Sequence, residues 1–258
     1  MNSVHRWALA GANLVFFAGV VVVNALANAL PINDVGTGEL SAEYPNLFVP
    51  AGITFGIWGV IYLLLAAYVI YALITRAAAL ERVGWWFVLS CAANMGWIFA
   101  WHYRLVGLSL IIMLALLGVL LTIYLRLQSS SRRRGPEGGW AERLTVELPF
   151  SVYFGWITVA TIANITALLV SLNWGGFGLP DAVWAIVLIV IATAIGVSVT
   201  LTRDDPWYGL VLVWAFAGIV IKRVSVEPFT AGVAGVAAAG ALLVLIVVVQ
   251  RLPRWLRP

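Results

Sequence analysis

The sequence has few residues that could carry out acid–base or metal chemistry. Its 258 residues include two histidines, His5 and His102, one cysteine, Cys91, and 11 acidic residues. A single cysteine excludes an intrachain disulfide and a cysteine-rich metal site. We find no serine–histidine–aspartate set, phosphate-binding glycine loop or metal-ligand motif. We therefore identify no catalytic residue and expect no metal site, and we expect His102, beside Arg104 at a helix end, to be solvated.

Charge is scarce as well, since charged residues make up 10% of the chain and hydrophobic residues 63%. Uncharged stretches of about 20 residues, the length of a helix that crosses a bilayer, fill most of the sequence. This pattern predicts an all-α integral membrane protein that contacts lipid and has no soluble domain. The net charge of +4 does not indicate nucleic-acid binding, because the basic residues lie at the ends of the expected helices, where they set orientation.

We expect eight transmembrane helices. Their ranges are 7–29, 51–75, 83–101, 106–125, 146–172, 182–202, 206–221 and 229–250. A hydrophilic linker is expected at 127–143. The seventh range, with 16 uncharged residues, is short for a span and would need Lys222 to extend toward the membrane surface. Small residues in the eighth range, among them Gly232, Gly235 and Gly240, favour tight helix packing.

The basic residues also predict orientation. If the connections alternate between the two sides, 12 of the 15 basic residues fall on the side of the termini, and only Arg104, Lys222 and Arg223 fall on the other. Cytoplasmic loops carry the excess of arginine and lysine. We therefore expect a multi-pass protein of a prokaryotic plasma membrane, with both termini cytoplasmic and the acidic loop at 30–49 outside.

The stretch 44–62 begins as a polar, proline-marked loop and should become a helix at about Pro50, because proline is tolerated in the first turn. Phe55, Trp58 and Tyr62 then follow at i, i+3 and i+7, so they share one helix face. An aromatic face at the mouth of a membrane helix and under a long loop suggests a covered pocket. An interfacial aromatic belt combined with helix packing explains the same pattern.

Two further spans carry an aromatic face with an amide. The third span has Asn94, Trp97 and Trp101 at i, i+3 and i+7, and the face of the fifth has Trp156, Ala160, Ala163 and Asn164. An asparagine in hydrocarbon is costly unless it is hydrogen-bonded. The two asparagines could bond across helices and fix the bundle. Alternatively, the three faces converge on one cavity, where aromatic walls stack on a flat apolar ligand and the amides orient it.

Residues 44–172 resemble the tryptophan-rich sensory protein/translocator protein (TspO/MBR) family. The resemblance rests on three segments in order: Ile57-Trp-Gly-Val-Ile-Tyr62, Asn94-Met-Gly-Trp97 and Trp156-Ile-Thr-Val-Ala-Thr-Ile-Ala-Asn164. It implies a five-helix TspO-like bundle at 1–173, with the loop at 30–50 as a lid, followed by a three-helix membrane extension at 174–258. The positions that match the family's ligand pocket are Trp58, Tyr62, Asn94, Trp97, Trp156, Ala160, Ala163 and Asn164.

The resemblance implies a membrane receptor, sensor or carrier for a planar hydrophobic ligand such as a porphyrin or haem, with no obligatory cofactor and with possible homodimers. The sequence departs from the family pattern at Pro50-Ala-Gly, where paired prolines and a tryptophan are common, and at Gly107-Leu-Ser, where a tryptophan-rich stretch is expected. The second departure removes one expected wall of the pocket.

Two other functions remain open. One is a secondary transporter that uses all eight helices for a small hydrophobic solute, although the scarcity of charge inside the membrane argues against ion coupling. The other is an enzyme that degrades its bound porphyrin with light. Such chemistry needs no acid–base motif, so the lack of one does not exclude it.

Overall fold

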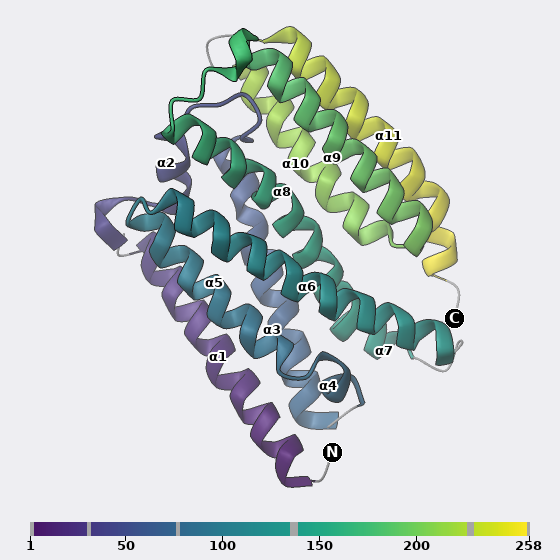
Figure 1. The fold of residues 1–258 in the computed structure, drawn as a ribbon. Helices are drawn as coiled ribbons and strands as arrows, with labels where there is room; N and C mark the ends of the chain where they lie inside the picture. Colours follow the sequence, from purple (N-terminus) through teal and green to yellow (C-terminus); the bar gives the residue numbers. More distant parts are fainter. Residues whose placement is uncertain (1–2, 30–31, 76–77, 135–138, 226–229, 257–258) are drawn as a thin grey trace. The chain divides into compact units, whose positions relative to one another are not determined.

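The structure, a computed structural model, describes residues 3–29, 32–75, 78–134, 139–225 and 230–256. All regular elements in these ranges are helical (Figure 1). The long helices are α1 Ser3–Ala29, α3 Ile57–Thr75, α5 Trp86–His102, α6 Val106–Arg134, α8 Leu148–Ser171, α9 Asp181–Arg203, α10 Pro206–Ser225 and α11 Ala231–Trp255. The short ones are η1 Ile32–Asp34, α2 Thr37–Ala42, η2 Gly52–Gly56, α4 Ala78–Val83, α7 Trp140–Glu142, the π-helical turn η4 Arg143–Glu147 and η5 Gly176–Gly178.

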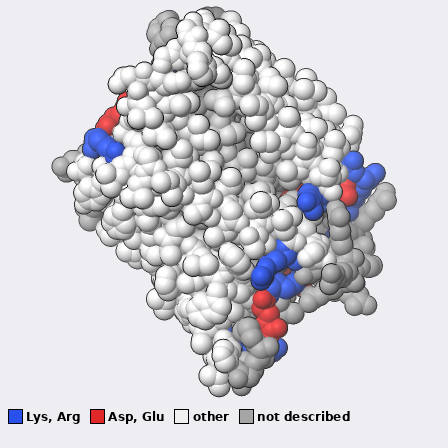
Figure 2. Space-filling model, viewed as in Figure 1, with Lys and Arg blue, Asp and Glu red and all other residues white. Residues whose placement is uncertain are grey.

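The architecture is that of an all-α, multi-pass membrane protein. Seven of the described helices are long and apolar enough to cross a bilayer. The remaining candidate, α5, has 17 residues, which is at the lower limit of a spanning helix, so the expected count of eight is approximately met. Helix α10 has 20 residues rather than the 16 expected. On the face drawn in Figure 2, charged side chains lie at the margins of a broad uncharged surface.

One expected boundary is met and another is wrong. The span expected at 51–75 is observed at Gly52–Thr75; its first residues, 52–56, form a 3₁₀ helix that continues as α3, an arrangement that is common at helix starts. The hydrophilic linker expected from residue 127 is helical as far as Arg134. Leu127 is still buried there, so the helix continues past the end of the apolar stretch.

The described chain divides into two compact units, and the first contains Met1–Thr37 and Trp58–Ile157. Within it α5 packs against α1 and α6. An edge-to-face triangle of Tyr68, Phe87 and Phe150, with ring centroids 5.0–5.9 Å apart, fills part of its core. Near α4, Arg6 forms an ion pair with Glu81 at 2.7 Å, and Arg82 pairs with Glu142. The boundary expected at residues 173/174 stays a prediction.

The second unit contains Gly38–Ile57 and Thr158–Arg257, and its helices α9, α10 and α11 pack against one another (Figure 1). A Cβ atom at Gly196, Gly209 or Gly240 would lie only 2.5–2.6 Å from an atom of a neighbouring helix. These glycines therefore allow close helix contact, as small residues commonly do in membranes. Gly232 and Gly235, which the sequence also suggested for packing, have no atom that close.

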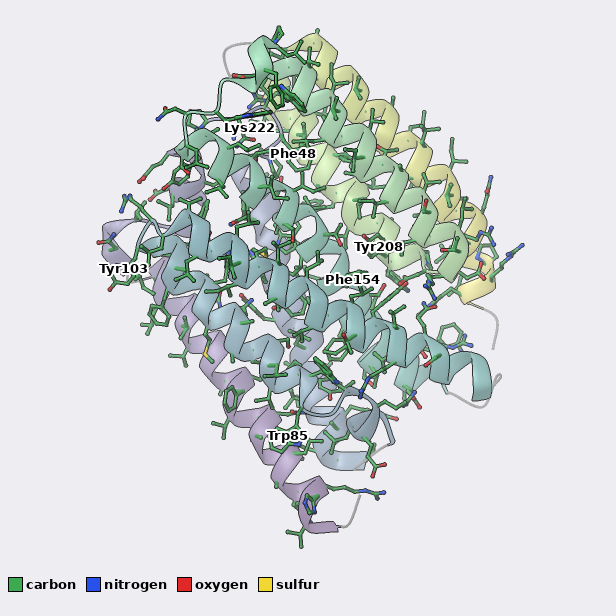
Figure 3. All side chains as sticks on the ribbon, viewed as in Figure 1. Phe48, Trp85, Tyr103, Phe154, Tyr208 and Lys222 are labelled. Atoms are coloured by element: carbon green, nitrogen blue, oxygen red, sulfur yellow. The ribbon has the colours of Figure 1, made fainter. Side chains whose placement is uncertain are left out.

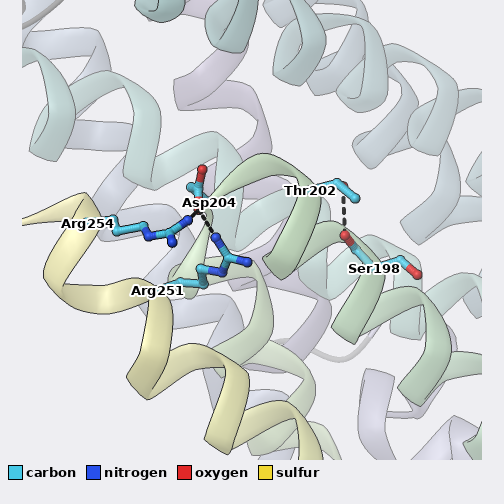
Figure 4. A network of polar contacts seen from close by, with 5 residues as sticks. All are labelled: Ser198, Thr202, Asp204, Arg251 and Arg254. Atoms are coloured by element: carbon cyan, nitrogen blue, oxygen red, sulfur yellow. Dashed lines mark hydrogen bonds and ion pairs between the residues drawn. The ribbon is translucent and has the colours of Figure 1, made fainter.

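Polar side chains stabilise the α9–α10 connection within the second unit. Asp204 adopts a left-handed conformation with φ 53° and accepts hydrogen bonds from Arg251 at 2.7 Å and Arg254 at 3.4 Å (Figure 4). Asp205 Oδ1 accepts from the backbone N–H groups of the two residues after Pro206, at 3.1 and 3.2 Å. This is an N-cap followed by proline in the first helical position, a pattern that fixes a helix start.

Candidate functional site

A row of stacked aromatic rings links α3 and α5 in the first unit. Tyr62 stacks on Trp58 with centroids 5.6 Å apart and planes at 22°. Trp58 stacks on Trp97 at 6.3 Å and 28°, and Trp97 on Trp101 at 6.0 Å and 15°. Each helix contributes neighbours on one face, as the helical spacing of these residues predicts. Offset stacking at these distances is favourable for aromatic pairs.

Helix α8 completes this aromatic cluster from a third direction. Tyr153 and Trp156 meet Trp58 edge-on, with centroids 6.0 and 6.3 Å away and planes at 69° and 86°. We use the name aromatic cluster for these six residues: Trp58, Tyr62, Trp97, Trp101, Tyr153 and Trp156. Trp58 is half-buried, whereas Trp97 and Trp156 are 6% and 2% exposed. Three helices thus meet around one indole ring.

Asn94 ties the same helices together through hydrogen bonds. Its side chain is completely buried. Its Oδ1 accepts from Asn24 Nδ2 of α1, and its Nδ2 donates to the Tyr153 hydroxyl of α8, both at 2.9 Å. Bonds of this kind remove the cost of a buried amide and hold helices in register. The interpretation of Asn94 as a residue that fixes the bundle therefore has direct support.

Two members of this arrangement, Tyr153 and Asn24, were not identified from the sequence. Tyr153 lies three residues before Trp156, so helical spacing alone would have placed it on the same face. Asn24 is an amide in the first membrane span, where polar side chains need a partner. Its partner, however, is 70 residues away, and the sequence offers no local signal for that pairing.

The aromatic cluster also contains polar atoms without a partner. The buried Trp97 Nε1 has no hydrogen-bond acceptor among the described residues. The Tyr62 hydroxyl lies near Asn94 but forms no hydrogen bond of good geometry there. Buried indole N–H and hydroxyl groups are normally paired, and each exception calls for an explanation. A bound molecule with an acceptor atom would satisfy both groups.

The cluster offers stacking and hydrogen bonding rather than charge. Its polar atoms are indole nitrogens and phenol oxygens, with the Asn94 amide beside them. Among the described residues there is no group of three or more histidine, cysteine, aspartate or glutamate side chains that could hold a metal ion. The arrangement therefore contains stacked aromatic rings and hydrogen-bonding groups but no charged side chain.

The first part of the expected lid is attached to the end of α5, next to Trp101. His102 contacts Thr37 Oγ1 at 3.0 Å and the Ile32 carbonyl at 3.1 Å, and its own carbonyl accepts from Asn33 at 3.0 Å. His102 is completely buried, so the expectation of a solvated histidine was wrong. The loop supplies hydrogen-bond partners for both ring nitrogens, which permits burial of the imidazole. Residues 32–37 therefore cover this end of α5.

The other four expected site residues, Phe55, Ala160, Ala163 and Asn164, belong to the second unit. Asn164 is 3% exposed, and Phe55, Ala160 and Ala163 are half-buried. Three of them follow Trp156 along α8, while Phe55 lies in η2. Their assignment to a ligand pocket stays a prediction.

The segment that leads into Trp58 is held by α10 within the second unit. The Ala51 N–H donates to the Gly218 carbonyl at 3.0 Å, and Trp214 Nε1 donates to the Thr54 carbonyl at 2.9 Å. A Cβ atom at Gly218 would lie only 2.9 Å from Pro50 Cβ. The backbone of this segment thus approaches α10 as closely as glycine allows. One of the three C-terminal helices therefore holds residues 50–54 in place within the second unit.

In a comparison with protein families, residues 8–249 match the model described as TSPO-like protein. Comparisons with curated proteins and with solved structures gave no match. The matched range exceeds residues 44–172, on which the sequence resemblance rested, and includes the three C-terminal helices. The multi-pass helical architecture agrees with the match. The chain belongs to the TSPO-like protein family.

Proposed function

We propose that this protein is a membrane receptor, sensor or carrier that binds a planar hydrophobic ligand, such as a porphyrin, at the aromatic cluster. The observation that carries the proposal is the stacked row of Tyr62, Trp58, Trp97 and Trp101, in which the buried Trp97 Nε1 has no acceptor among the described residues. Family membership supports ligand binding in general, and the chemistry of the cluster supports this class of ligand.

Binding would be driven by desolvation and by stacking. A flat ligand that packs on the half-buried Trp58 gains about 0.5–1.5 kcal/mol for each well-placed aromatic pair beyond the burial of area. A carbonyl or carboxylate oxygen on its rim would accept from Trp97 Nε1–H and orient the ring system. Residues 32–37, held by His102, would limit access at the Trp101 end of the row.

We further propose that both termini lie in the cytoplasm of a prokaryotic cell. The support is the distribution of basic residues, of which 12 of 15 fall on the side of the termini. A cysteine introduced near either end of the chain should then react only after the membrane is made permeable. Labelling of such cysteines in intact cells would contradict this orientation.

Tryptophan quenching by protoporphyrin IX tests the binding proposal on the purified protein. We expect saturable binding that Trp156→Ala weakens roughly tenfold, because it removes an edge contact to Trp58 together with apolar area. Trp97→Phe keeps an aromatic ring but removes the N–H, so it should weaken binding by a smaller factor. Trp174→Ala is the matched control, since Trp174 is a tryptophan of the second unit that packs with Phe177 and Trp184.

Two outcomes would count against the proposal. The first is the absence of saturable binding to the wild-type protein. The second is binding that Trp156→Ala and Trp97→Phe leave as tight as Trp174→Ala does. In either case family membership would indicate the fold but not ligand binding, and transport by the whole helix bundle would become the better hypothesis.

A further inference from the structure

A buried arginine for which the described residues supply no counter-ion lies at the end of α10, in the second unit. Arg223 is 4% exposed, and its Nε has no hydrogen-bond partner among the described residues. No aspartate or glutamate of the described part forms an ion pair with it. A buried cation without an ion-pair partner is unfavourable, and here the buried Nε–H also lacks an acceptor. Such a group is a candidate for binding an ion of opposite charge.

Other groups beside Arg223 also favour a negative charge. Lys222 precedes it and is half-buried; Figure 3 labels its side chain. Thr230, the N-cap residue of α11, donates its backbone N–H to the Arg223 carbonyl at 3.4 Å. Its buried Oγ1 has no partner among the described residues. The start of α11, where the positive end of the helix dipole lies, is therefore next to the backbone of Arg223.

Ordinary placement of a cation at a helix end does not explain this arrangement. Lysine and arginine at the end of a membrane span usually extend their charged groups into water. Arg254, at the opposite end of this unit, does so: its side chain is 60% exposed and contacts Asp204. Arg223 is buried instead, and it is one of only three basic residues expected on its side of the membrane, so orientation signals do not require it there.

We propose that Arg223, together with Lys222, Thr230 and the first turn of α11, forms a binding site for a phosphate group. The guanidinium is a planar fork that matches phosphate oxygens, and hydrogen bonds between charged groups are the strongest of their kind. The Thr230 hydroxyl supplies a further donor. The phosphate comes either from a lipid headgroup, since α10 ends at a membrane surface, or from solution. The site uses none of the residues 226–229, and it is independent of ligand binding at the aromatic cluster.

Thermal unfolding of the purified protein in a neutral detergent tests the proposal. We expect the unfolding midpoint to rise with added phosphatidylglycerol or with inorganic phosphate, and to be unchanged by phosphatidylcholine at equal concentration. A response to phosphatidylglycerol alone identifies the lipid headgroup as the source, and a response to inorganic phosphate identifies free phosphate. No response to either overturns the proposal.

The variant Arg223→Met should change the unfolding midpoint in a direction that the proposal fixes. Without phosphate its midpoint should be higher than that of the wild type, because the unpaired buried charge is gone. Its affinity for the phosphate group, read from the rise of the midpoint with concentration, should be roughly tenfold weaker, as expected when a charged hydrogen bond is lost. Arg203→Met, which removes an exposed cation of the same unit, is the matched control and should respond like the wild type. Equal responses of the two variants would show that phosphate is attracted by the positive charge of the protein in general, and would overturn the proposal of a site at Arg223.

Glu227 lies outside the described residues, four positions after Arg223, and is tested directly. If it neutralised Arg223, Glu227→Gln would lower the midpoint and the wild type would show no phosphate response, which would overturn the proposal. The proposal expects Glu227→Gln to respond to phosphate at least as strongly as the wild type. Thr230→Val, which keeps the shape of the side chain, should weaken the response by a smaller factor than Arg223→Met.

Discussion

The substitution Gly218→Ala should loosen the segment that leads into Trp58. A Cβ atom at Gly218 would overlap Thr54 Oγ1 and would lie 2.9 Å from the Cβ atoms of Pro50 and Thr54. Neither partner is the far end of a long side chain that could turn away. The segment at 50–54 therefore has to move away from α10, or the helix has to shift.

The structure sets the size of this effect. The shift weakens two hydrogen bonds, from Ala51 N–H to the Gly218 carbonyl and from Trp214 Nε1–H to the Thr54 carbonyl, each worth about 1 kcal/mol. Overpacking adds about 1–3 kcal/mol. The higher helix propensity of alanine stabilises the variant by about 1 kcal/mol, which offsets part of this loss. The free energy of unfolding should fall by about 2–4 kcal/mol.

Thermal unfolding of the purified protein measures this loss, with Gly235→Ala as the matched control. Gly235 lies in α11 of the same unit, and a Cβ atom there meets nothing within 4 Å, so the control should keep or raise the midpoint. Porphyrin binding by Gly218→Ala should also weaken, because the displaced segment runs directly into α3, where Trp58 is the second residue. Equal midpoints for the two variants would refute the reasoning, since the close approach of the segment to α10 would then not exist.

Asn94→Leu should lower the free energy of unfolding by about 1–3 kcal/mol, because it removes two buried side-chain hydrogen bonds, one with Asn24 and one with Tyr153. In a double-mutant cycle with Asn24→Leu the two costs should not add, and strictly additive costs would contradict the hydrogen bond. Arg6→Gln should change the response to acid. The hydrogen bond from Arg6 lowers the pKa of Glu81 below its ordinary value of 4.5, so the pair contributes stability above about pH 4.5 and loses it as the pH falls through the lowered pKa. The wild-type midpoint should fall across that acid range more than the midpoint of the variant, and identical pH profiles would show that the pair contributes nothing.

Local spacing was sufficient to predict the helices and the faces of the aromatic residues. Long uncharged stretches indicate membrane helices because hydrocarbon requires every backbone group to be bonded within the segment. The 3.6-residue period places Trp58 with Tyr62, and Trp97 with Trp101, before any neighbour is known. The structure shows both pairs stacked. Binding at these residues remains the proposal tested above.

The sequence alone could not show which faces meet, because that depends on packing between distant segments. Asn94 and Asn24 are separated by 70 residues, and Trp214 and Thr54 by 160. The burial of His102 depends on loop residues 32–37, and no local pattern predicts that Arg223 is buried. A polar residue near a helix end looks solvated in sequence, and only its neighbours in space decide whether water reaches it. The sequence by itself therefore determined the membrane architecture and the composition of each helix face, while the tertiary structure decided which polar groups of the described residues are paired and which lack a partner among them.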